Sequence, residues 1–422
     1  MSAALQGPRS ALISTAQLVR EPSSSLLKWR AQYGDPFLLP TLNGPVVFTG
    51  RPELVRQIFN APAHFFAPFE PDAMAPVVGT GSLLSATGTA HRQQRRAIAP
   101  GLVGNAMPFW TRQIRALTQA QIAQAGAQID PRATFMDAAL EVVERLIFGA
   151  PDPEFSRLLR AMLSRIHPSF LFSTKRRLNP LYLHYARASK ALDAALFARI
   201  KAAKARAQEP AMLSAMVHAK DPDGQDFFEA QQIRDQLRLL LIAGHETTAT
   251  AQAWVAIHLA AHPQVQDQLR AELQAAPKPA SKGLLAAVVD ETLRRSPVVR
   301  EVLREVAQPL VLGAHTLPVG TGVAASVWLA HNAACWGDPR AWRPERFLKG
   351  TLTPGSYFPF GGGARRCIGA ALALTQLRVT TAEWLKQGRF VALEPLPVDA
   401  ERHGVIFGPP ACALGFERDR LG

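Results

Sequence analysis

Cys367 stands in a sequence setting that could make it a metal ligand. It ends the run Phe360-Gly-Gly-Gly-Ala-Arg-Arg-Cys, and an alanine-rich segment that we expect to be helical follows from Gly369. Unpaired N–H groups and partial positive charge at a helix N-terminus lower the pKa of a thiol, and Arg365 and Arg366 add positive charge. A thiolate is one of the few axial ligands of haem iron, so the pattern permits a haem site.

Two other interpretations of this run are possible. The first is an inert, buried cysteine in a glycine turn, which is the more common role of an isolated cysteine. The second is a phosphate-binding loop, but the GK[ST] sequence that such a loop requires is absent. Gly369, Ala370 and Ala373 leave one side of the expected helix flat, so a large planar ligand could lie close to it.

A second pattern, Ala243-Gly-His-Glu-Thr-Thr248, lies in the middle of an expected helix of residues 229–262. A glycine inside a helix costs about 1 kcal/mol relative to alanine. Glu246 and Thr247 cost more in an apolar helix unless they are paired or hydrated. A threonine hydroxyl can bond back to a carbonyl one turn earlier and bend the helix, and Gly244 would then leave room for a ligand. The alternative is a kink whose polar groups are satisfied.

Two weaker patterns are charged. Glu291 and Arg294 lie three residues apart and share one helical face, and Arg346 in the downstream Pro-Glu-Arg-Phe could join them. His91 and Arg95 also share a face and could hold a carboxylate or phosphate. Taken alone, each pattern is more typical of a solvated surface.

The elements that must position these residues are mostly helical. Asn43-Gly44 predicts a hairpin within 36–50, short β runs are expected within 309–330, and a last β pair around Val405 and Cys412. Two segments, 61–88 and 168–180, are expected to be irregular. The expected helices are 52–60, 89–103, 108–128, 136–149, 153–166, 181–206, 229–262, 284–295 and a last one from near Cys367 to Lys386.

The middle of the 229–262 helix is apolar on every side, which is typical of a helix that crosses a large core. We therefore predict a mainly α fold with small β-sheets, as a single domain of residues 1–422. Its expected parts are a β-rich segment of about 35–60, a helical core of about 89–300 and a ligand-binding loop at 360–369.

Composition narrows the function class only in part. The 422 residues are 48% hydrophobic and 19% charged, which excludes a disordered chain. The formal charge of +14 is compatible with nucleic acid, an anionic membrane or an acidic protein as partner. Three cysteines without a CxxC make a disulfide framework unexpected. No apolar run is long enough for a membrane span and no signal-peptide core is visible, so a soluble cytoplasmic protein is expected.

In this order and at these separations, the four patterns resemble those of the cytochrome P450 family. FGGGARRCIG fits the family's F-x-x-G-x-R-x-C-x-G signature at every fixed position, AGHETT fits its central-helix pattern, and ETLR followed by PERF fits its structural charge network. The resemblance covers nearly the whole chain. It implies a P450-like domain with a long central helix over the haem.

The resemblance also implies roles for individual residues. Cys367 would be the axial thiolate of haem b, with Phe360, Gly361 and Gly369 around it. Thr247 and Glu246 would deliver protons to bound dioxygen beside Ala243 and Gly244. The remaining roles are listed by group: His91, Arg95, Arg304 and Arg365 at the haem propionates; Glu291, Arg294 and Arg346 as a buried network; and Phe66, Phe69, Leu240, Val299, Arg300 and Ile406 around the substrate.

One dipeptide, Arg300-Glu301, is unusual at its position. Arg300 is a second candidate for the propionate arginine beside Arg304. It could equally pair with Glu301, or reach the substrate and orient a polar substituent.

The resemblance implies a prokaryotic monooxygenase that inserts oxygen from O2 into an unactivated C–H bond of a bulky lipophilic substrate (a terpenoid, steroid, fatty acid or polyketide-like molecule). Electrons from NAD(P)H would come through a separate acidic ferredoxin or flavodoxin-like donor with its reductase. We expect a monomer that binds no nucleic acid. A peroxide-using relative and a non-catalytic haem or ligand-binding protein are the alternatives, and the retained Glu246-Thr247 pair disfavours both.

Overall fold

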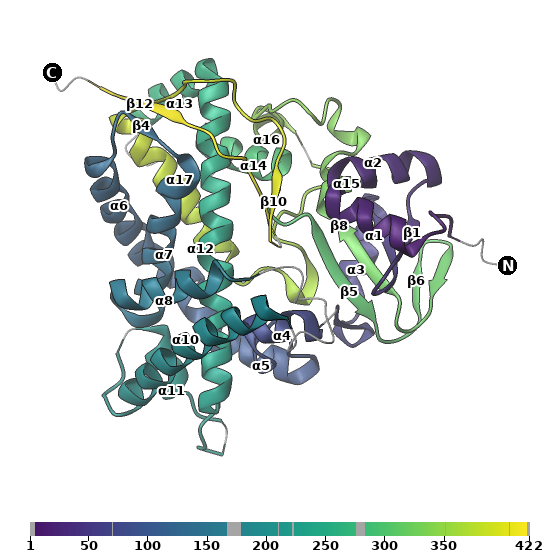
Figure 1. Ribbon diagram of the computed structural model, residues 1–422. Coiled ribbons are helices and arrows are strands. Elements are labelled where there is room, and N and C mark those ends of the chain that lie inside the picture. The colour runs from purple at the N-terminus through teal and green to yellow at the C-terminus, as the bar shows by residue number, and fades with distance from the viewer. Residues whose placement is uncertain are drawn as a thin grey trace. The chain divides into compact units, whose positions relative to one another are not determined.

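The computed structural model describes residues 5–69, 71–166, 179–209, 211–221, 223–275, 283–350, 352–404 and 406–419. The chain forms two compact units (Figure 1). Unit 1 comprises Met1–Glu70 and Ala280–Cys367, and unit 2 comprises Pro71–Pro279 and Ile368–Gly422. Helices dominate and the sheets are small, so the predicted fold class is confirmed.

Unit 1 is built on a five-stranded sheet with the order β1-β2-β8-β5-β3. The hairpin predicted at Asn43-Gly44 is confirmed, because Thr41 pairs with Gly44 and the glycine has φ +109°. Its strands are β1 (Phe37–Thr41), β2 (Gly44–Thr49), β3 (Phe66–Pro68), β5 (Glu301–Val306) and β8 (Gly322–Ser326), and β6 (Leu310–Leu312) pairs with β7 (His315–Leu317). Its helices are α1 (Ala11–Arg20), α2 (Pro22–Tyr33), α3 (Pro52–Asn60), α14 (Leu284–Arg295), α15 (Val327–His331) and α16 (Arg346–Lys349).

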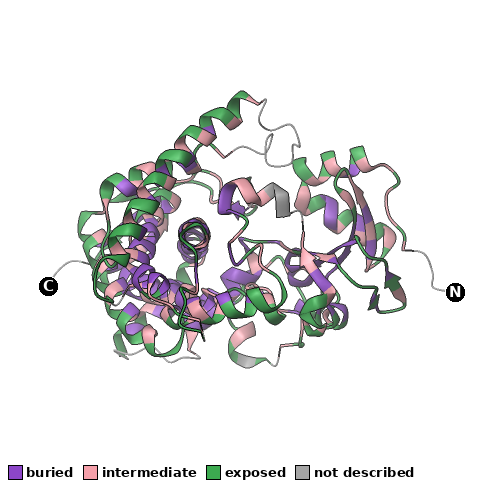
Figure 2. Ribbon diagram, turned by 90° about the horizontal axis from the view of Figure 1, so that it is seen from below, coloured by how far each residue is buried: buried purple, intermediate pink, exposed green. Residues whose placement is uncertain are grey.

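Unit 2 is a helical bundle around one long helix, α12 (Ala230–Ala261). Figure 2, in which α12 is seen end-on, colours most of this helix as buried. The apolar middle that predicts a core helix is only half-buried at most of its positions, and the buried residues lie mainly before and after it. The other helices are α4 (Pro71–Val78), α5 (Gly88–Ile98), α6 (Met107–Gln124), α7 (Pro131–Phe148), α8 (Pro153–Leu163), α10 (Pro180–Lys204), α11 (Met212–Val217), α13 (Pro263–Ala275) and α17 (Ala370–Gln387). Strand β12 (Leu414–Arg418) lies between β4 (Gln128–Ile129) and β9 (Gly388–Ala392), and β10 (Glu401–His403) pairs with β11 (Ile406–Gly408).

Local sequence sets the starts of several unit 2 helices. Asp130, Asp152 and Asn179 each precede a proline, and each side chain accepts hydrogen bonds from N–H groups of the first turn. This combination supplies an acceptor for otherwise unpaired donors and a residue whose fixed φ suits the first helical position. No described helix is long and apolar enough to cross a membrane.

The prolines of the segment 61–88 indicate an irregular structure, but part of this segment is helical. It contains α4, with Pro76 inside the helix. Tertiary contacts hold this helix in place: the Tyr185 hydroxyl donates to the Pro76 carbonyl at 2.7 Å, and the Arg238 guanidinium donates to the carbonyls of Pro76 and Val77 at 3.1 and 2.8 Å. The helices α1, α2 and α13 were also not expected. Most of the other irregular segment, 168–180, lies outside the described residues.

A buried charge network fixes the end of α14 in unit 1. The Glu291 carboxylate has no solvent exposure and accepts from Arg294 Nε at 2.7 Å and Nη2 at 2.8 Å. It also lies 3.3 Å from Arg346 Nε and accepts from the Arg343 N–H at 2.8 Å. Arg294 in turn donates to the carbonyls of His331, Pro339 and Ala341. The structure thus brings Glu291, Arg294 and Arg346 together.

His331 links this network to the loop that contains Cys367. Its Nδ1 lies 3.2 Å from the Arg294 carbonyl, and its Nε2 accepts from the Phe358 N–H at 3.3 Å. These two bonds need the neutral ring with its proton on Nδ1. Burial, followed by the nearby Arg294 charge, lowers the pKa of His331 to about 3.

This histidine should make the protein acid-labile. The unfolded chain takes up a proton near the ordinary histidine pKa of about 6.5, whereas the folded chain resists it down to about 3. The contribution is therefore fully present above about pH 6.5 and is lost as the pH falls, by about 1.4 kcal/mol per pH unit. We expect the free energy of unfolding in urea to fall less steeply between about pH 6.5 and pH 4 in His331→Asn than in the parent. Identical slopes would contradict the assignment.

Candidate functional site

Backbone hydrogen bonds shape the loop around Cys367 in unit 1. The Cys367 N–H donates to the Phe360 carbonyl at 2.9 Å, and the Gly361 N–H donates to the Phe358 carbonyl at 2.9 Å. Cys367 itself is exposed, and α17 begins three residues later, after Gly369. The loop therefore presents the sulfur close in sequence to a helix N-terminus, as the sequence predicts.

Two of the three glycines of the loop, Gly362 and Gly363, are needed because α3 lies against them. A Cβ at Gly362 would collide with the Phe59 ring, and one at Gly363 would collide with the Phe59 carbonyl. Gly361 and Gly363 also have φ values of +66° and +65°, a region that side chains with a Cβ rarely adopt. The glycine run thus lets the loop lie directly on Phe59, a partner that the sequence motif alone does not indicate.

Arg304 provides a buried cation next to this loop. Its Nη2 donates to the Gly362 carbonyl at 3.0 Å, and the guanidinium lies 5.1 Å from the centre of the Phe66 ring. Among the described residues no carboxylate pairs with it, and its buried Nε has no hydrogen-bond partner. Burial, and then the charge of Arg365, lowers the pKa of Arg304 to about 10. A desolvated cation of this kind suits an anionic ligand.

Arg300 makes contacts that the sequence does not reveal. It is buried, its guanidinium donates to the Ser23 hydroxyl, and it lies 4.1 Å from the centre of the Trp328 ring. The neighbouring Glu301 accepts from the Ser326 hydroxyl at 3.2 Å. Since these contacts direct Arg300 toward α2 and α15, they favour Arg304 over Arg300 as the anion-binding residue and do not support a substrate contact by Arg300.

In unit 2, one face of α12 is accessible although most of the helix is buried. Ala243 is exposed, and Leu240, Gly244 and Thr247 are half-buried on the same helical face. The Thr247 hydroxyl donates to the Ala243 carbonyl at 2.8 Å, the back-bond that the sequence suggests. This stripe of small and apolar residues could lie beside a ligand.

Gly244 serves helix packing as well. A Cβ on this residue would lie 2.9 Å from Val143 Cγ2, so the space that the glycine leaves is taken by α7. The adjacent His245 is buried, its Nδ1 lies 2.6 Å from the Leu241 carbonyl, and burial lowers its pKa. Space for a ligand beside α12 would therefore have to be provided by the neighbouring Ala243 and Thr247 and not by Gly244.

Glu246 belongs to a polar chain that the sequence did not reveal. Arg132, in the first turn of α7, donates to Glu246 Oε1 at 3.1 Å, and its other terminal nitrogen lies 3.1 Å from His403 Nδ1. The Arg132 and Glu246 side chains keep about 30% of their exposure, so the ion pair is in contact with water. Arg132 follows a helix start, Asp130-Pro131, but no motif marks it as a partner of a residue 114 positions away.

The other predicted site residues are distributed as follows. His91 is buried and Arg95 half-buried on one face of α5, whereas Phe66 lies in the hydrophobic core of unit 1. Phe66 is therefore a core residue that also contacts Arg304. Phe69 packs near Gly322, Val299 is exposed, and Ile406 is buried in β11.

These residues fit a haem. In unit 1 the loop offers an exposed cysteine, and Arg304 is a buried cation that no carboxylate of the described residues pairs with. In unit 2, α12 offers an accessible face of small residues. The other two thiols are poorer iron ligands, because burial raises the pKa of Cys335 and raises that of Cys412 to about 11.

Comparisons with known proteins agree with this chemistry. A family model described as Cytochrome P450 matches residues 6–410. Cytochrome P450 135B1 of Mycobacterium bovis is 32% identical over 400 residues, which cover 90% of this chain and 84% of the relative. Cytochrome P450 137 of Mycobacterium tuberculosis is 29% identical over 404 residues, or 91% and 83% of the two chains.

Solved structures share the fold. A retinoic acid-bound cyanobacterial CYP120A1 has a TM-score of 0.87 at 22% identity and covers 96% of both chains. The haem domain of cytochrome P450DA has a TM-score of 0.85 at 19% identity and covers 99% of this chain and 98% of its own. With the family match over nearly its whole length and the cysteine loop in place, this chain belongs to the cytochrome P450 family of haem-thiolate monooxygenases.

Proposed function

We propose that this P450 inserts one atom of O2 into an unactivated C–H bond of a bulky lipophilic substrate. The observation that carries the proposal is the Glu246-Thr247 pair on the accessible face of α12. A binder or a peroxide-using enzyme has no need of a carboxylate and a hydroxyl side by side on the accessible face of this helix. The pair therefore favours an enzyme that must move protons.

Four groups of residues would hold the haem. Cys367 would bind the iron, with Phe360 packed beside the sulfur. Arg304 and Arg365 from unit 1, and His91 and Arg95 from α5, would bind the propionates. When bound, the haem supplies a thiolate-ligated iron at which dioxygen is reduced and one oxygen atom passes to carbon.

The geometry of Thr247 suits a proton relay. A hydroxyl has one proton and two lone pairs, and Thr247 directs its proton to the Ala243 carbonyl. Its oxygen lone pairs are left to accept a hydrogen bond, so the hydroxyl could hold in place a water molecule that delivers a proton. Glu246, half-exposed and adjacent, would bring that proton from water, and Arg132 would hold its carboxylate in position.

Apolar residues support a lipophilic substrate. Leu240 and Ala243 on α12 are accessible, and Val299 is 41% exposed. Mostly apolar walls with few polar groups suit a terpenoid, steroid, fatty acid or polyketide-like molecule. The retinoic acid in the cyanobacterial neighbour, an apolar ligand, is consistent with this class.

Electrons would come from NAD(P)H through a separate protein. Arg92, Arg96 and Arg366 are exposed, and the chain carries a net +14 charge. Positive surface of this kind favours an acidic ferredoxin or flavodoxin-like donor, which would be steered by charge.

Removing the thiolate should remove the family's spectral signature. In the parent, the reduced carbonyl complex should show the red-shifted Soret band of a thiolate-bound haem. Cys367→Ala should lose this band, while Cys335→Ala and Cys412→Ala keep it. Retention of the band in Cys367→Ala would overturn the assignment of the iron ligand.

Removing the Thr247 hydroxyl should uncouple the enzyme. In Thr247→Ala, NAD(P)H should still be consumed in the presence of a redox system, but hydrogen peroxide should replace product. Positioned proton donors contribute about a hundredfold or more, so product per electron should fall on that scale. Thr248→Ala, on the same helix but with a buried side chain, is the matched control. Unchanged yield in Thr247→Ala would exclude proton delivery, and efficient turnover with peroxide alone would favour the peroxide-using alternative.

Arg132 should act as a positioning residue for Glu246. Arg132→Gln leaves the carboxylate without its cation at 3.1 Å, so we expect product per electron to fall by about tenfold, less than for loss of the acid itself. Arg132→Lys should restore part of the yield. Arg145→Gln, which breaks the Glu141 pair on the same helix, is the control. A loss of thermal stability with unchanged product per electron would show a purely structural role.

A further inference from the structure

Helix α1 has large aliphatic residues on its outer face. Its inner face carries Ser14, whose hydroxyl donates to the Ser10 carbonyl at 2.7 Å, and Leu18, which is half-buried and packs against the core of unit 1. Leu12, Ile13 and Val19 face solvent instead and are 67%, 58% and 60% exposed. A helix that packs on a core normally buries such residues, so this face points to an external partner.

The helix is firmly held in this orientation. Ser10 caps it by accepting from the Ile13 N–H at 3.3 Å, and the segment before it is tied to β1 because the Leu38 N–H donates to the Gln6 carbonyl at 2.9 Å. Thr15 accepts from the Leu42 N–H at 3.0 Å, which places the β1–β2 hairpin tip beside α1. Leu42 is itself 64% exposed and extends the apolar surface.

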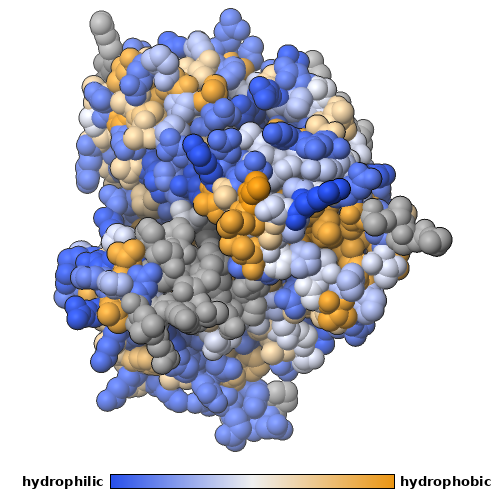
Figure 3. Space-filling view, turned by 45° about the vertical axis from the view of Figure 1, so that its right-hand side comes forward, coloured by the Kyte–Doolittle hydropathy of each residue, from blue (hydrophilic) through white to orange (hydrophobic). Residues whose placement is uncertain are grey.

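Basic residues accompany these aliphatic side chains. Arg9, Arg20 and Lys28 are exposed, and Arg20 lies on the outward face of α1. The face that comes forward in Figure 3, from the side where α1 lies in Figure 1, shows apolar groups next to hydrophilic ones. We call the set Leu12, Ile13, Val19, Leu42, Arg20 and Lys28 the α1 surface.

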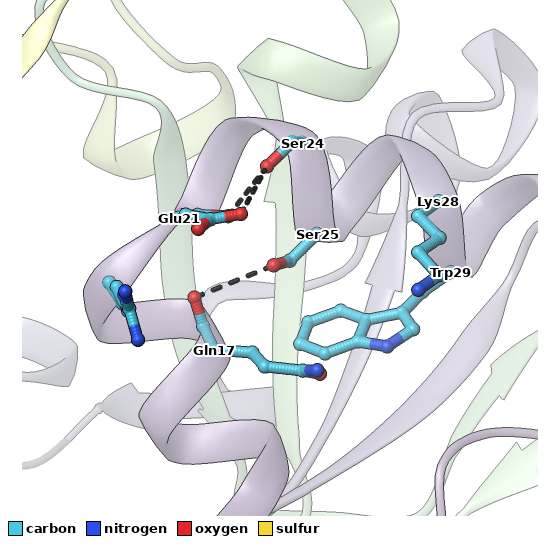
Figure 4. Close-up of a pocket in the computed structure, with 7 residues that line it drawn as sticks. Gln17, Glu21, Ser24, Ser25, Lys28 and Trp29 are labelled. Carbon is cyan, nitrogen blue, oxygen red and sulfur yellow. Dashed lines mark hydrogen bonds between the residues drawn. The ribbon is translucent and has the colours of Figure 1, made fainter.

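A groove between α1 and α2 adds a place for a polar headgroup. It has a volume of about 380 Å³ and is lined by Gln17, Arg20, Glu21, Ser24, Ser25, Lys28 and Trp29. In Figure 4 the Gln17 side chain extends toward the Trp29 indole, and Ser24 and Ser25 bond to Glu21 and to the Gln17 carbonyl. Two cations against one carboxylate, Glu21, leave the groove net positive.

We propose that the α1 surface binds the surface of an anionic lipid bilayer. Aliphatic side chains on one face of a helix, with basic residues beside them, are typical of helices that lie in the membrane interface. Arg20 and Lys28 would bind phosphate groups while Leu12, Ile13, Val19 and Leu42 enter the acyl boundary. A net-anionic bilayer matches both the apolar and the positive character of this surface, whereas an acidic soluble protein would match only the second.

Vesicle binding tests the proposal. The full-length haem-loaded protein is floated with vesicles of phosphatidylcholine alone, or of equal parts phosphatidylcholine and phosphatidylglycerol. We expect binding to the anionic vesicles only, reduced by high salt. Leu12→Ser with Ile13→Ser and Val19→Ser should weaken it by about tenfold or more through lost apolar burial. Arg20→Gln with Lys28→Gln should also weaken it by about tenfold or more.

Matched controls separate the α1 surface from general effects. Leu393→Ser with Val398→Ser removes exposed aliphatic residues elsewhere, and Arg112→Gln with Lys190→Gln removes the same number of exposed charges from unit 2. Both should bind like the parent. The haem spectrum and melting temperature check folding, and if the triple variant does not fold, the Arg20/Lys28 variant decides.

Three outcomes would overturn the proposal. The first is no binding to either vesicle, and the second is an equal loss in the control variants. The third is self-association of the parent, abolished by the triple variant without any vesicle binding, which would show that a second copy covers the α1 surface.

Discussion

The loop that contains Cys367 depends on one constraint: the Glu291 carboxylate has no access to solvent and must be paired within the protein. A buried charge must be paired and fully hydrogen-bonded, and removing one partner of such a pair costs about 3–5 kcal/mol. Here Arg294 neutralises the Glu291 carboxylate and donates further hydrogen bonds to the carbonyls of residues 331, 339 and 341. His331 then receives the Phe358 N–H, and the Phe358 carbonyl receives that of Gly361. A continuous set of bonds thus runs from the end of α14 to the loop that presents Cys367.

In unit 2 a second polar group in an apolar setting, Glu246, determines how the candidate site is arranged. Glu246 lies on a helix whose other residues are mostly buried, yet it stays accessible and is paired with Arg132. The ion pair holds the carboxylate in position, and its partial exposure leaves it in contact with water. Thr247, the next residue, is held by a hydrogen bond to the Ala243 carbonyl within its own helix. The two neighbouring side chains are thus fixed in different ways, Glu246 by a cation from α7 and Thr247 by α12 itself.

Much of this arrangement could be predicted from the sequence, and the failures have physical causes. The hairpin at Asn43-Gly44 and the long helix α12 follow from local turn chemistry and apolar periodicity. The contact of Arg132 with Glu246 does not, because nothing local links residues 114 positions apart. Helix α4 was not predicted because its prolines favour a loop. Arg238 and Tyr185, which are distant in sequence, stabilise the helix by donating hydrogen bonds to its carbonyls. The contacts of Arg300 and Phe66 also could not be predicted, since packing against Trp328 and within the core of unit 1 determines them.

Helix α1 illustrates the same limit at the level of a whole face. The periodicity of Leu12, Ala16 and Val19 defines an apolar stripe, and a stripe of this kind predicts that one side of a helix is covered. The stripe alone does not identify the partner that covers this side. In unit 1 the opposite side of α1, which carries Ser14 and Leu18, faces inward, because the N–H groups of Leu38 and Leu42 bond to the Gln6 carbonyl and the Thr15 hydroxyl. The apolar stripe is thereby left outward by hydrogen bonds that do not involve it, and the outward position of Leu12 and Val19 is a consequence of how the helix is anchored rather than of their own hydropathy.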